Sequence, residues 1–181
     1  MNLPNRLTVI RLLLIPVFLV VATMESRYAD YAAAIVFGVA VLTDCLDGYF
    51  ARKKKQETVL GKFMDPLADK ILISTALIIL VEMGRIPGWV AAVIIGREFA
   101  VTGLRTVAAS EGLIIPANLL GKVKTVTQVV AIIALFIKNY PFSLIGFPFG
   151  NLSMFAAVVF TLWSGTVYFT IAWKQLDKSG R

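Results

Sequence analysis

The sequence has no histidine and a single cysteine among its 181 residues. Without histidine, Ser-His and Cys-His catalytic pairs and histidine-ligated metal sites are excluded. One cysteine excludes a disulfide within the chain. Charged residues are also scarce, at 16%, whereas typical soluble domains have about 25%. Hydrophobic residues reach 58%, so the composition indicates an integral membrane protein rather than a soluble domain.

The charge that is present is mainly positive. Lysine and arginine number 18 and aspartate and glutamate 11, which gives a formal net charge of +7. In so apolar a chain, this excess favours an anionic membrane surface or an anionic substrate as the partner, and we expect no nucleic acid.

Six apolar stretches divide the chain: Leu12–Thr23, Tyr31–Thr43, Ile71–Val81, Ile86–Ile95, Val126–Ile137 and Leu152–Trp173. A helix needs about 20 residues to cross the hydrocarbon core of a bilayer, and only the last stretch is long enough by itself. We expect a polar segment at one end of each other stretch to complete it. The prediction is one all-α membrane domain over residues 1–181, with six transmembrane helices and a possible short interfacial helix at the N-terminus.

The basic residues indicate the orientation. With six spans, fifteen of the 18 lie on the side of the two termini, and only Arg27, Arg85 and Lys138 lie on the other. Cytoplasmic segments are enriched in lysine and arginine, so both termini are predicted to be cytoplasmic. The five polar helix ends face the same side. Because polar segments at membrane depth are tolerated only around a cavity, we expect a positively charged cavity there.

Four of the six aspartates lie at the ends of two neighbouring apolar stretches: Asp44, Asp47, Asp65 and Asp69. Residues three or four apart share a helix face, so each pair is expected to point together. Pro66 is expected in the first turn of its helix, where proline is tolerated. The connection from Arg52 to Gly61 is short, so the two helices are predicted to be antiparallel neighbours whose acidic faces meet.

Four carboxylates in one partly desolvated pocket repel each other unless protons or cations neutralise them. Oxygen ligands favour hard ions, so Mg²⁺ or Mn²⁺ is expected. Gly48 and Gly61 leave space for a bulky ligand beside the backbone, and Arg52 is a fixed cation suited to a phosphate. Salt bridges at solvated helix ends, or an ion pathway, would be simpler interpretations, but the spacing of these residues favours the metal site.

The pattern Asp44-x2-Asp47-Gly48-x2-Ala51-Arg52-x8-Gly61-x3-Asp65-x3-Asp69 resembles the signature of the CDP-alcohol phosphatidyltransferase family, with every specified position filled. The resemblance implies a six-helical, usually dimeric enzyme that depends on divalent metal, with two ions held by the four aspartates. It implies transfer of a phosphatidyl group from a CDP-linked lipid to an alcohol, with release of CMP. A carboxylate must then act as the base. The resemblance gives this role to Asp69, which geometry alone does not separate from Asp65.

Other segments are similar to the bacterial members of the family that make phosphatidylglycerophosphate: Asn2–Arg11, Gly96–Phe99, Gly103–Arg105 and Gly121–Gln128. The last stretch matches only as an apolar helix. The similarity implies CDP-diacylglycerol as donor, glycerol 3-phosphate as acceptor, and the bacterial cytoplasmic membrane as location, with the site facing the cytoplasm. Candidates for binding the CDP-lipid are Gly48, Ala51, Arg52, Gly61, Asn5 and Thr8.

Candidates for binding the acceptor phosphate are Arg105, Lys122, Lys124 and Arg97. Lys122 and Lys124 are two residues apart, so a regular helix would not aim both at one point. Inositol phosphate or serine could replace glycerol 3-phosphate as the acceptor at the same metal site. Outside the family, the alternative is a small cation-coupled transporter. A transporter would place its acids near the bilayer midplane and tend to show paired repeats, and neither feature is present here.

Overall fold

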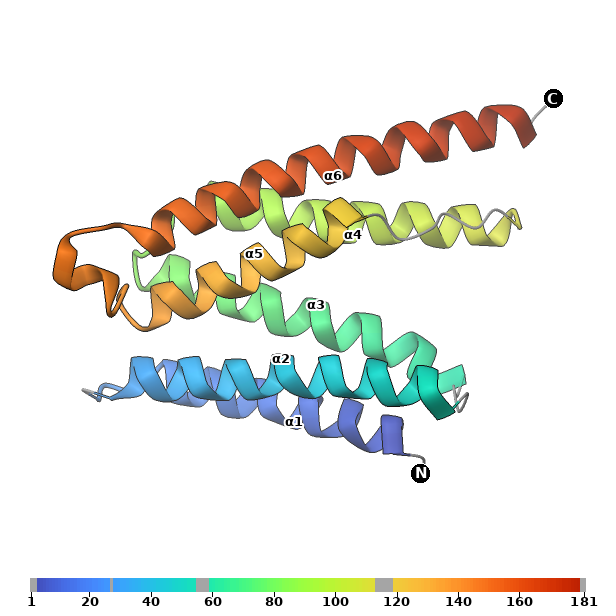
Figure 1. Ribbon diagram of the computed structural model, residues 1–181. Helices are drawn as coiled ribbons and strands as arrows, with labels where there is room; N and C mark the ends of the chain where they lie inside the picture. The colour runs from blue at the N-terminus through green and yellow to red at the C-terminus, as the bar shows by residue number, and fades with distance from the viewer. Residues whose placement is uncertain (1–2, 27, 55–58, 113–118, 180–181) are drawn as a thin grey trace.

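The computed structural model describes the backbone of residues 3–26, 28–54, 59–112 and 119–179, and the side chains of 9–26, 28–43, 67–112 and 119–173. Within these residues the chain forms six α-helices and one short 3-10 helix, and no strand (Figure 1). The elements are α1 (Leu3–Ala22), α2 (Ala29–Lys54), α3 (Val59–Glu82), α4 (Gly88–Ser110), α5 (Leu119–Phe136), η1 (Phe142–Ile145) and α6 (Phe149–Ser179). The predicted all-α architecture is confirmed for this part of the chain.

The first helix, α1, is continuous from Leu3 to Ala22. The possible interfacial helix at the N-terminus is therefore not separated from the first apolar stretch in the described residues, and its place at a membrane surface stays a prediction. Pro4 falls in the first turn, where its missing N–H has no helical acceptor. Pro16 lies inside the helix and removes one backbone hydrogen bond without ending it.

The acidic motif lies on helical backbone, since α2 continues to Lys54 and α3 begins at Val59. Asp44 and Asp47 therefore share one helix, and Asp65 and Asp69 share the next. Pro66 lies inside α3 and not in its first turn, because the helix starts well before the apolar stretch. The spacing of each pair along one helix face holds for the backbone. The helices α2 and α3 run antiparallel and contact each other, and both pack against α1.

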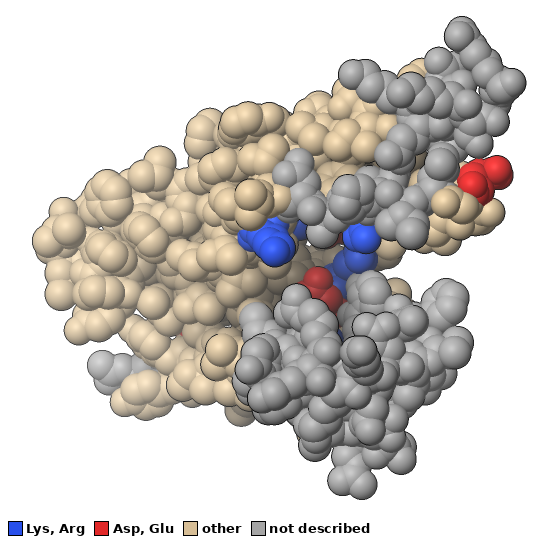
Figure 2. Space-filling model, turned by 45° about the vertical axis from the view of Figure 1, so that its right-hand side comes forward, with Lys and Arg blue, Asp and Glu red and all other residues tan. Residues whose placement is uncertain are grey.

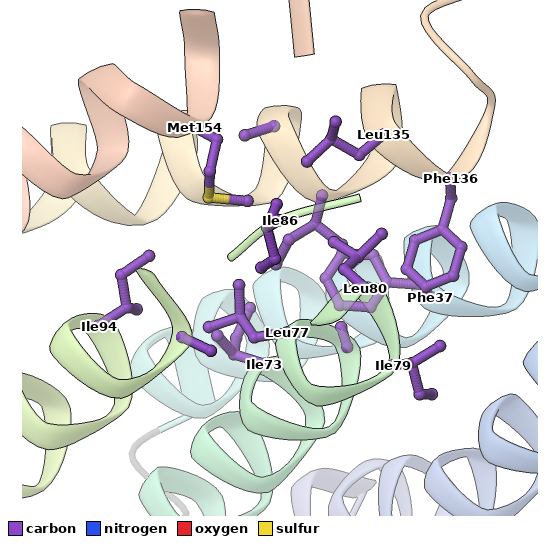
Figure 3. Packing of buried hydrophobic residues seen from close by; sticks show 14 of the residues in the cluster. Phe37, Ile73, Leu77, Ile79, Leu80, Ile86, Ile94, Leu135, Phe136 and Met154 are labelled. Carbon is purple, nitrogen blue, oxygen red and sulfur yellow. The ribbon is translucent and has the colours of Figure 1, made fainter. Parts of the chain in front are cut away.

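Apolar side chains from all six α-helices form the main core. Phe18 of α1 packs against Phe37 of α2 and Phe136 of α5, with ring centroids 5.7 Å and 5.5 Å apart. Leu77 of α3 and Ile94 of α4 are fully buried in the same cluster (Figure 3). Lipid is as apolar as these side chains, so close packing rather than exclusion from water stabilises such contacts in a membrane.

Arg85, in the turn between α3 and α4, connects three helices at one end of the bundle. Its guanidinium lies 2.7 Å from the carboxylate of Asp30. It also donates hydrogen bonds to the carbonyls of Leu135 and Phe136, at 2.9 Å and 3.1 Å. These carbonyls belong to the last two residues of α5, and no later N–H group of the same helix can donate a hydrogen bond to them. Lys138 lies 2.8 Å from the other oxygen of Asp30, so Arg85 and Lys138 gather at one end, as their placement by sequence predicts.

The helices α5 and α6 form an antiparallel pair with close contacts at both ends. A Cβ atom at Gly121 would lie 3.6 Å from the hydroxyl of Tyr168. At the other end, the N–H of Gly150 donates to Oδ1 of Asn139 at 2.6 Å, and a Cβ on this glycine would lie 3.0 Å from Leu135. The antiparallel register therefore brings the first turns of α5 beside residues 164–168 of α6.

Among the residues whose side chains are described, two helices are long and apolar enough to cross a membrane: α5, and α6 from Phe149 to Trp173. The helix α5 reaches this length because it includes Lys122–Thr125, and a polar segment at one end was expected to complete the apolar stretch from Val126. Large apolar side chains more than half exposed include Leu13, Ile35, Leu42, Leu162 and Trp173. Such an exterior suits a bilayer better than water.

Candidate active site

A cavity of about 490 Å³ lies among α3, α4, α5 and α6, at the end of the bundle where α1 begins and α6 ends. Five basic side chains line it: Lys70, Arg97, Arg105, Lys122 and Lys124. Glu98 is the only acidic residue among the described residues of its lining. Figure 2 shows lysine and arginine side chains gathered in a hollow, with acidic atoms between them. The predicted positively charged cavity is therefore present.

One face of α4 forms the longest wall of this cavity. Glu98, Val101, Thr102 and Arg105 follow the spacing that places residues on one side of a helix. Thr102 donates its hydroxyl hydrogen bond back to the carbonyl of Glu98, at 2.7 Å, so this hydroxyl is already engaged by its own helix. Arg105 is exposed, whereas Glu98 is partly buried. On this wall, Arg105 therefore lies closer to the solvent than Glu98 does.

Glu98 connects two cations from different helices. Its Oε1 accepts a hydrogen bond from Arg97 Nη1 at 3.0 Å and one from Lys124 Nζ. The side chains are 18% exposed for Glu98, 10% for Arg97 and 5% for Lys124. Arg97, Lys124 and Glu98 together carry a net charge of +1, and all three side chains are largely buried. Such a charge attracts an anion into the cavity.

Contacts from α6 complete the surroundings of Arg97. Its Nη2 donates to the hydroxyl of Ser164 at 2.8 Å. Its guanidinium carbon lies 5.6 Å from the centroid of the Tyr168 ring, which is within cation–π range. Sequence reasoning missed these two residues because it treated the last stretch only as an apolar helix. Polar side chains inside that apolar stretch are the signal that could have found them.

The structure brings all four candidates for the acceptor phosphate to one cavity. Lys122 and Lys124 both line it, although they are two residues apart on α5. Lys124 is buried against Glu98 and Lys122 is exposed. This agrees with the expectation that a regular helix would not aim both lysines at one point, because they reach the cavity at different depths.

Asp69 is the one member of the aspartate motif whose side chain is described. It is partly buried on α3, its charge acts on Lys124, and the next residue, Lys70, lines the cavity. Asp69 therefore lies near the α3 wall. The other motif and donor candidates lie outside the described side chains: Asp44, Asp47, Asp65, Gly48, Ala51, Arg52, Gly61, Asn5 and Thr8.

Comparison with known proteins agrees with the motif. Residues 1–163 match the family CDP-alcohol phosphatidyltransferase. The chain belongs to this family. It is 47% identical to the CDP-diacylglycerol–glycerol-3-phosphate 3-phosphatidyltransferase of Bacillus subtilis, over 98% of each chain. Proteins of the same name from Pseudomonas fluorescens and Escherichia coli are 39% identical, over 100% of this chain and 95% of the relative, and 37% identical, over 94% of each chain.

CDP-alcohol phosphatidyltransferases are membrane-associated enzymes. Membership in the family therefore confirms the resemblance carried by the aspartate motif. It also explains why the composition is so apolar and why large hydrophobic side chains remain exposed around the bundle.

In this phosphatidyltransferase, changing Glu98 to glutamine is expected to lower the free energy of unfolding by about 3 kcal/mol. The change leaves Arg97 and Lys124 close together with no carboxylate between them. Thermal unfolding in detergent measures the loss, and the double variant with Lys124→Met is expected to recover part of it. Glu82→Gln, on the exposed end of α3, is the matched control. Parental stability of the Glu98→Gln variant would contradict a stabilising role for this ion cluster.

Proposed function

We propose that this protein transfers the phosphatidyl group from CDP-diacylglycerol to glycerol 3-phosphate, giving phosphatidylglycerophosphate and CMP in phospholipid biosynthesis. The relatives from three bacteria, which align over nearly the whole chain, carry the name of this reaction. The structural observation that carries the proposal is the cavity lined by five basic side chains, one of which, Lys124, is influenced by the charge of Asp69. The positive charge of this cavity is suited to binding CDP-diacylglycerol and glycerol 3-phosphate, which both carry phosphate groups.

In this reaction, a hydroxyl oxygen of glycerol 3-phosphate attacks the lipid-side phosphorus of the diphosphate. A new P–O bond forms as the bond between this phosphorus and the CMP oxygen breaks, and CMP leaves. The hydroxyl proton passes to Asp69, which acts as the general base. The chain has no histidine, so a carboxylate near the cavity is the natural proton acceptor.

Four aspartates are proposed to hold two divalent ions, Mg²⁺ or Mn²⁺: Asp44, Asp47, Asp65 and Asp69. Carboxylate oxygens are the ligands that such hard ions prefer, so the donor set fits them. The antiparallel contact of α2 and α3, which carry the two pairs, supports this assignment. When bound, the ions neutralise the diphosphate and stabilise the leaving CMP.

The donor lipid is proposed to bind beside the ions, at the ends of α1, α2 and α3. The candidate positions lie on described helical backbone: Asn5, Thr8, Gly48, Ala51, Arg52 and Gly61. In Figure 1 the start of α1, the end of α2 and the start of α3 lie at the same end of the bundle. This is also the end at which the cavity opens.

The acceptor phosphate is proposed to bind at the positive wall formed by α4 and α5. Arg105 and Lys122 are exposed there and can contact the phosphate directly. Arg97 and Lys124 lie deeper and share one carboxylate, so they add the remaining positive charge. This division of roles keeps the acceptor close to Asp69.

We further propose that all six helices cross a bacterial cytoplasmic membrane, with both termini and the site on the cytoplasmic side. The distribution of basic residues supports this orientation, as does the arrangement in which α1 begins and α6 ends at the same end of the bundle. A homodimer is proposed on the family resemblance alone.

A direct test compares acceptors with purified protein in detergent. CMP release from CDP-diacylglycerol with Mg²⁺ is expected on addition of glycerol 3-phosphate, and not with serine or inositol phosphate. Serine lacks the phosphate that the positive cavity accommodates, and the inositol ring is much bulkier than glycerol. CMP release only with another alcohol would contradict the acceptor assignment. No release with any acceptor, together with cation uptake in vesicles, would favour the transporter.

A further inference from the structure

The last helix contacts Arg97, a residue of the cavity lining, through residues that have no role in the proposed reaction. Ser164 is fully buried, and its hydroxyl has two hydrogen bonds. It donates to the carbonyl of Thr161 at 3.2 Å and accepts from Arg97 Nη2 at 2.8 Å. The hydroxyl proton of Ser164 is used in the hydrogen bond to the Thr161 carbonyl within α6. A lone pair of the same oxygen is therefore available to accept from the guanidinium. The serine is therefore oriented as an acceptor for Arg97.

Gly165 makes room for the side chain of Arg97. A Cβ atom at this position would lie 3.3 Å from Cγ and 3.7 Å from Nε of Arg97. The first distance is tighter than an ordinary contact between carbon atoms. The aliphatic part of the Arg97 side chain therefore packs against α6 at Gly165, where no side chain obstructs it.

Arg97 needs these contacts to keep one orientation. Its Nε is buried and has no hydrogen-bond partner among the described residues. Its Nη1 shares a single oxygen of Glu98 with Lys124, so the glutamate supplies one point of attachment. The hydroxyl of Ser164 supplies the second point, and the ring of Tyr168 lies against the guanidinium.

We propose that α6 positions Arg97 for the acceptor phosphate, with Ser164 and Gly165 as positioning residues that act through the arginine. Ser164 fixes the direction of the guanidinium, and Gly165 allows its stem to pass. Tyr168, which lines the cavity, covers the guanidinium on the α6 side. This proposal rests on the proposed function of the cavity as the acceptor site.

The test measures KM for each substrate in single variants. Ser164→Ala is expected to raise KM for glycerol 3-phosphate about five-fold, because it removes a hydrogen bond to a charged group. KM for CDP-diacylglycerol and kcat are expected to stay near the parental values. Gly165→Ala is expected to raise the same KM about ten-fold, since the added methyl group displaces Arg97. A parental KM for glycerol 3-phosphate in both variants would overturn the proposal.

Gly38→Ala is the matched control for the added methyl group. Gly38 lies inside α2, and a Cβ there would meet nothing within 4 Å. This variant is expected to keep the parental KM values and unfolding temperature. If Gly165→Ala does not fold, Ser164→Ala decides the outcome by itself, because it only removes an oxygen atom.

A double-mutant cycle with Arg97→Lys separates positioning from a general loss of stability. Lysine lacks the planar fork of arginine, so Arg97→Lys is expected to raise KM for glycerol 3-phosphate. Adding Ser164→Ala is then expected to cause no further rise, whereas independent effects would multiply and overturn the proposal. A parental KM in Arg97→Lys would instead contradict the acceptor site. A raised KM in Arg97→Lys with a parental KM in Ser164→Ala would overturn only the positioning by α6.

Discussion

Replacing Asp69 by asparagine is expected to lower the rate of CMP release by about 1,000-fold. Asparagine has nearly the same shape but cannot accept the hydroxyl proton, and its amide is a poorer metal ligand than a carboxylate. Asp69 lies on α3 beside the cavity and within the electrostatic reach of Lys124. The measurement is kcat at saturating CDP-diacylglycerol and glycerol 3-phosphate. Thermal unfolding of the same preparation is expected to show that the fold is retained.

Glu82→Gln is the control for this change, because Glu82 is an exposed carboxylate at the opposite end of the same helix. Its rate of CMP release is expected to equal that of the parent. Near-parental release by the Asp69→Asn variant would remove Asp69 from the role of base. A large rate loss in both variants would show that the assay responds to charge on α3 in general.

Removing divalent ions with EDTA is expected to reduce CMP release by at least about 1,000-fold. Without the ions, the charge of the diphosphate and of the departing CMP is not neutralised. The four aspartates also repel each other when no cation lies between them. Excess Mg²⁺ or Mn²⁺ is expected to restore the rate. Ca²⁺ is expected to restore less, because it prefers longer bonds and more ligands than Mg²⁺.

Ion binding itself can be followed separately from turnover. Mg²⁺ is expected to raise the unfolding temperature of the parent protein, since a ligand that binds only the folded state stabilises it. This shift is expected to be smaller in Asp69→Asn. Full activity in the presence of EDTA would contradict the assignment of the aspartates to metal, while the family membership would stand.

The number of helices could be predicted from the sequence, and several helix boundaries could not. Each of the six apolar stretches corresponds to one α-helix of the described residues, because each stretch is long enough to form the buried part of a helix. Hydropathy does not show where a helix ends when polar residues continue it. The helix α3 therefore starts at Val59, and Pro66 lies inside it. The residues from Leu3 onward likewise extend α1 and form no element of their own.

In the candidate site, too, some features could be predicted from the sequence and others could not. The basic residues of α4 and α5 could be predicted because they stand out at the ends of apolar stretches. The contact of Arg97 with Ser164 joins residues far apart in the chain, and no local pattern encodes such a pair. Only packing of α6 against α4 and α5 brings them together. The spacing of Lys122 and Lys124 predicts that they lie on different faces of α5, and only the packing determines which of them is buried.

Arg85 joins α2, α3 and α5 at the end of the bundle away from the cavity, through Asp30 and the last carbonyls of α5. A helix bundle that is fastened at one end can widen only at the other. Any movement of the helices that admits a substrate of the proposed reaction is therefore expected at the cavity end. The aromatic contact of Phe18 with Phe136 lies away from the cavity and is expected to keep its packing when a substrate binds, so the apolar layer that separates the two sides of the membrane is preserved.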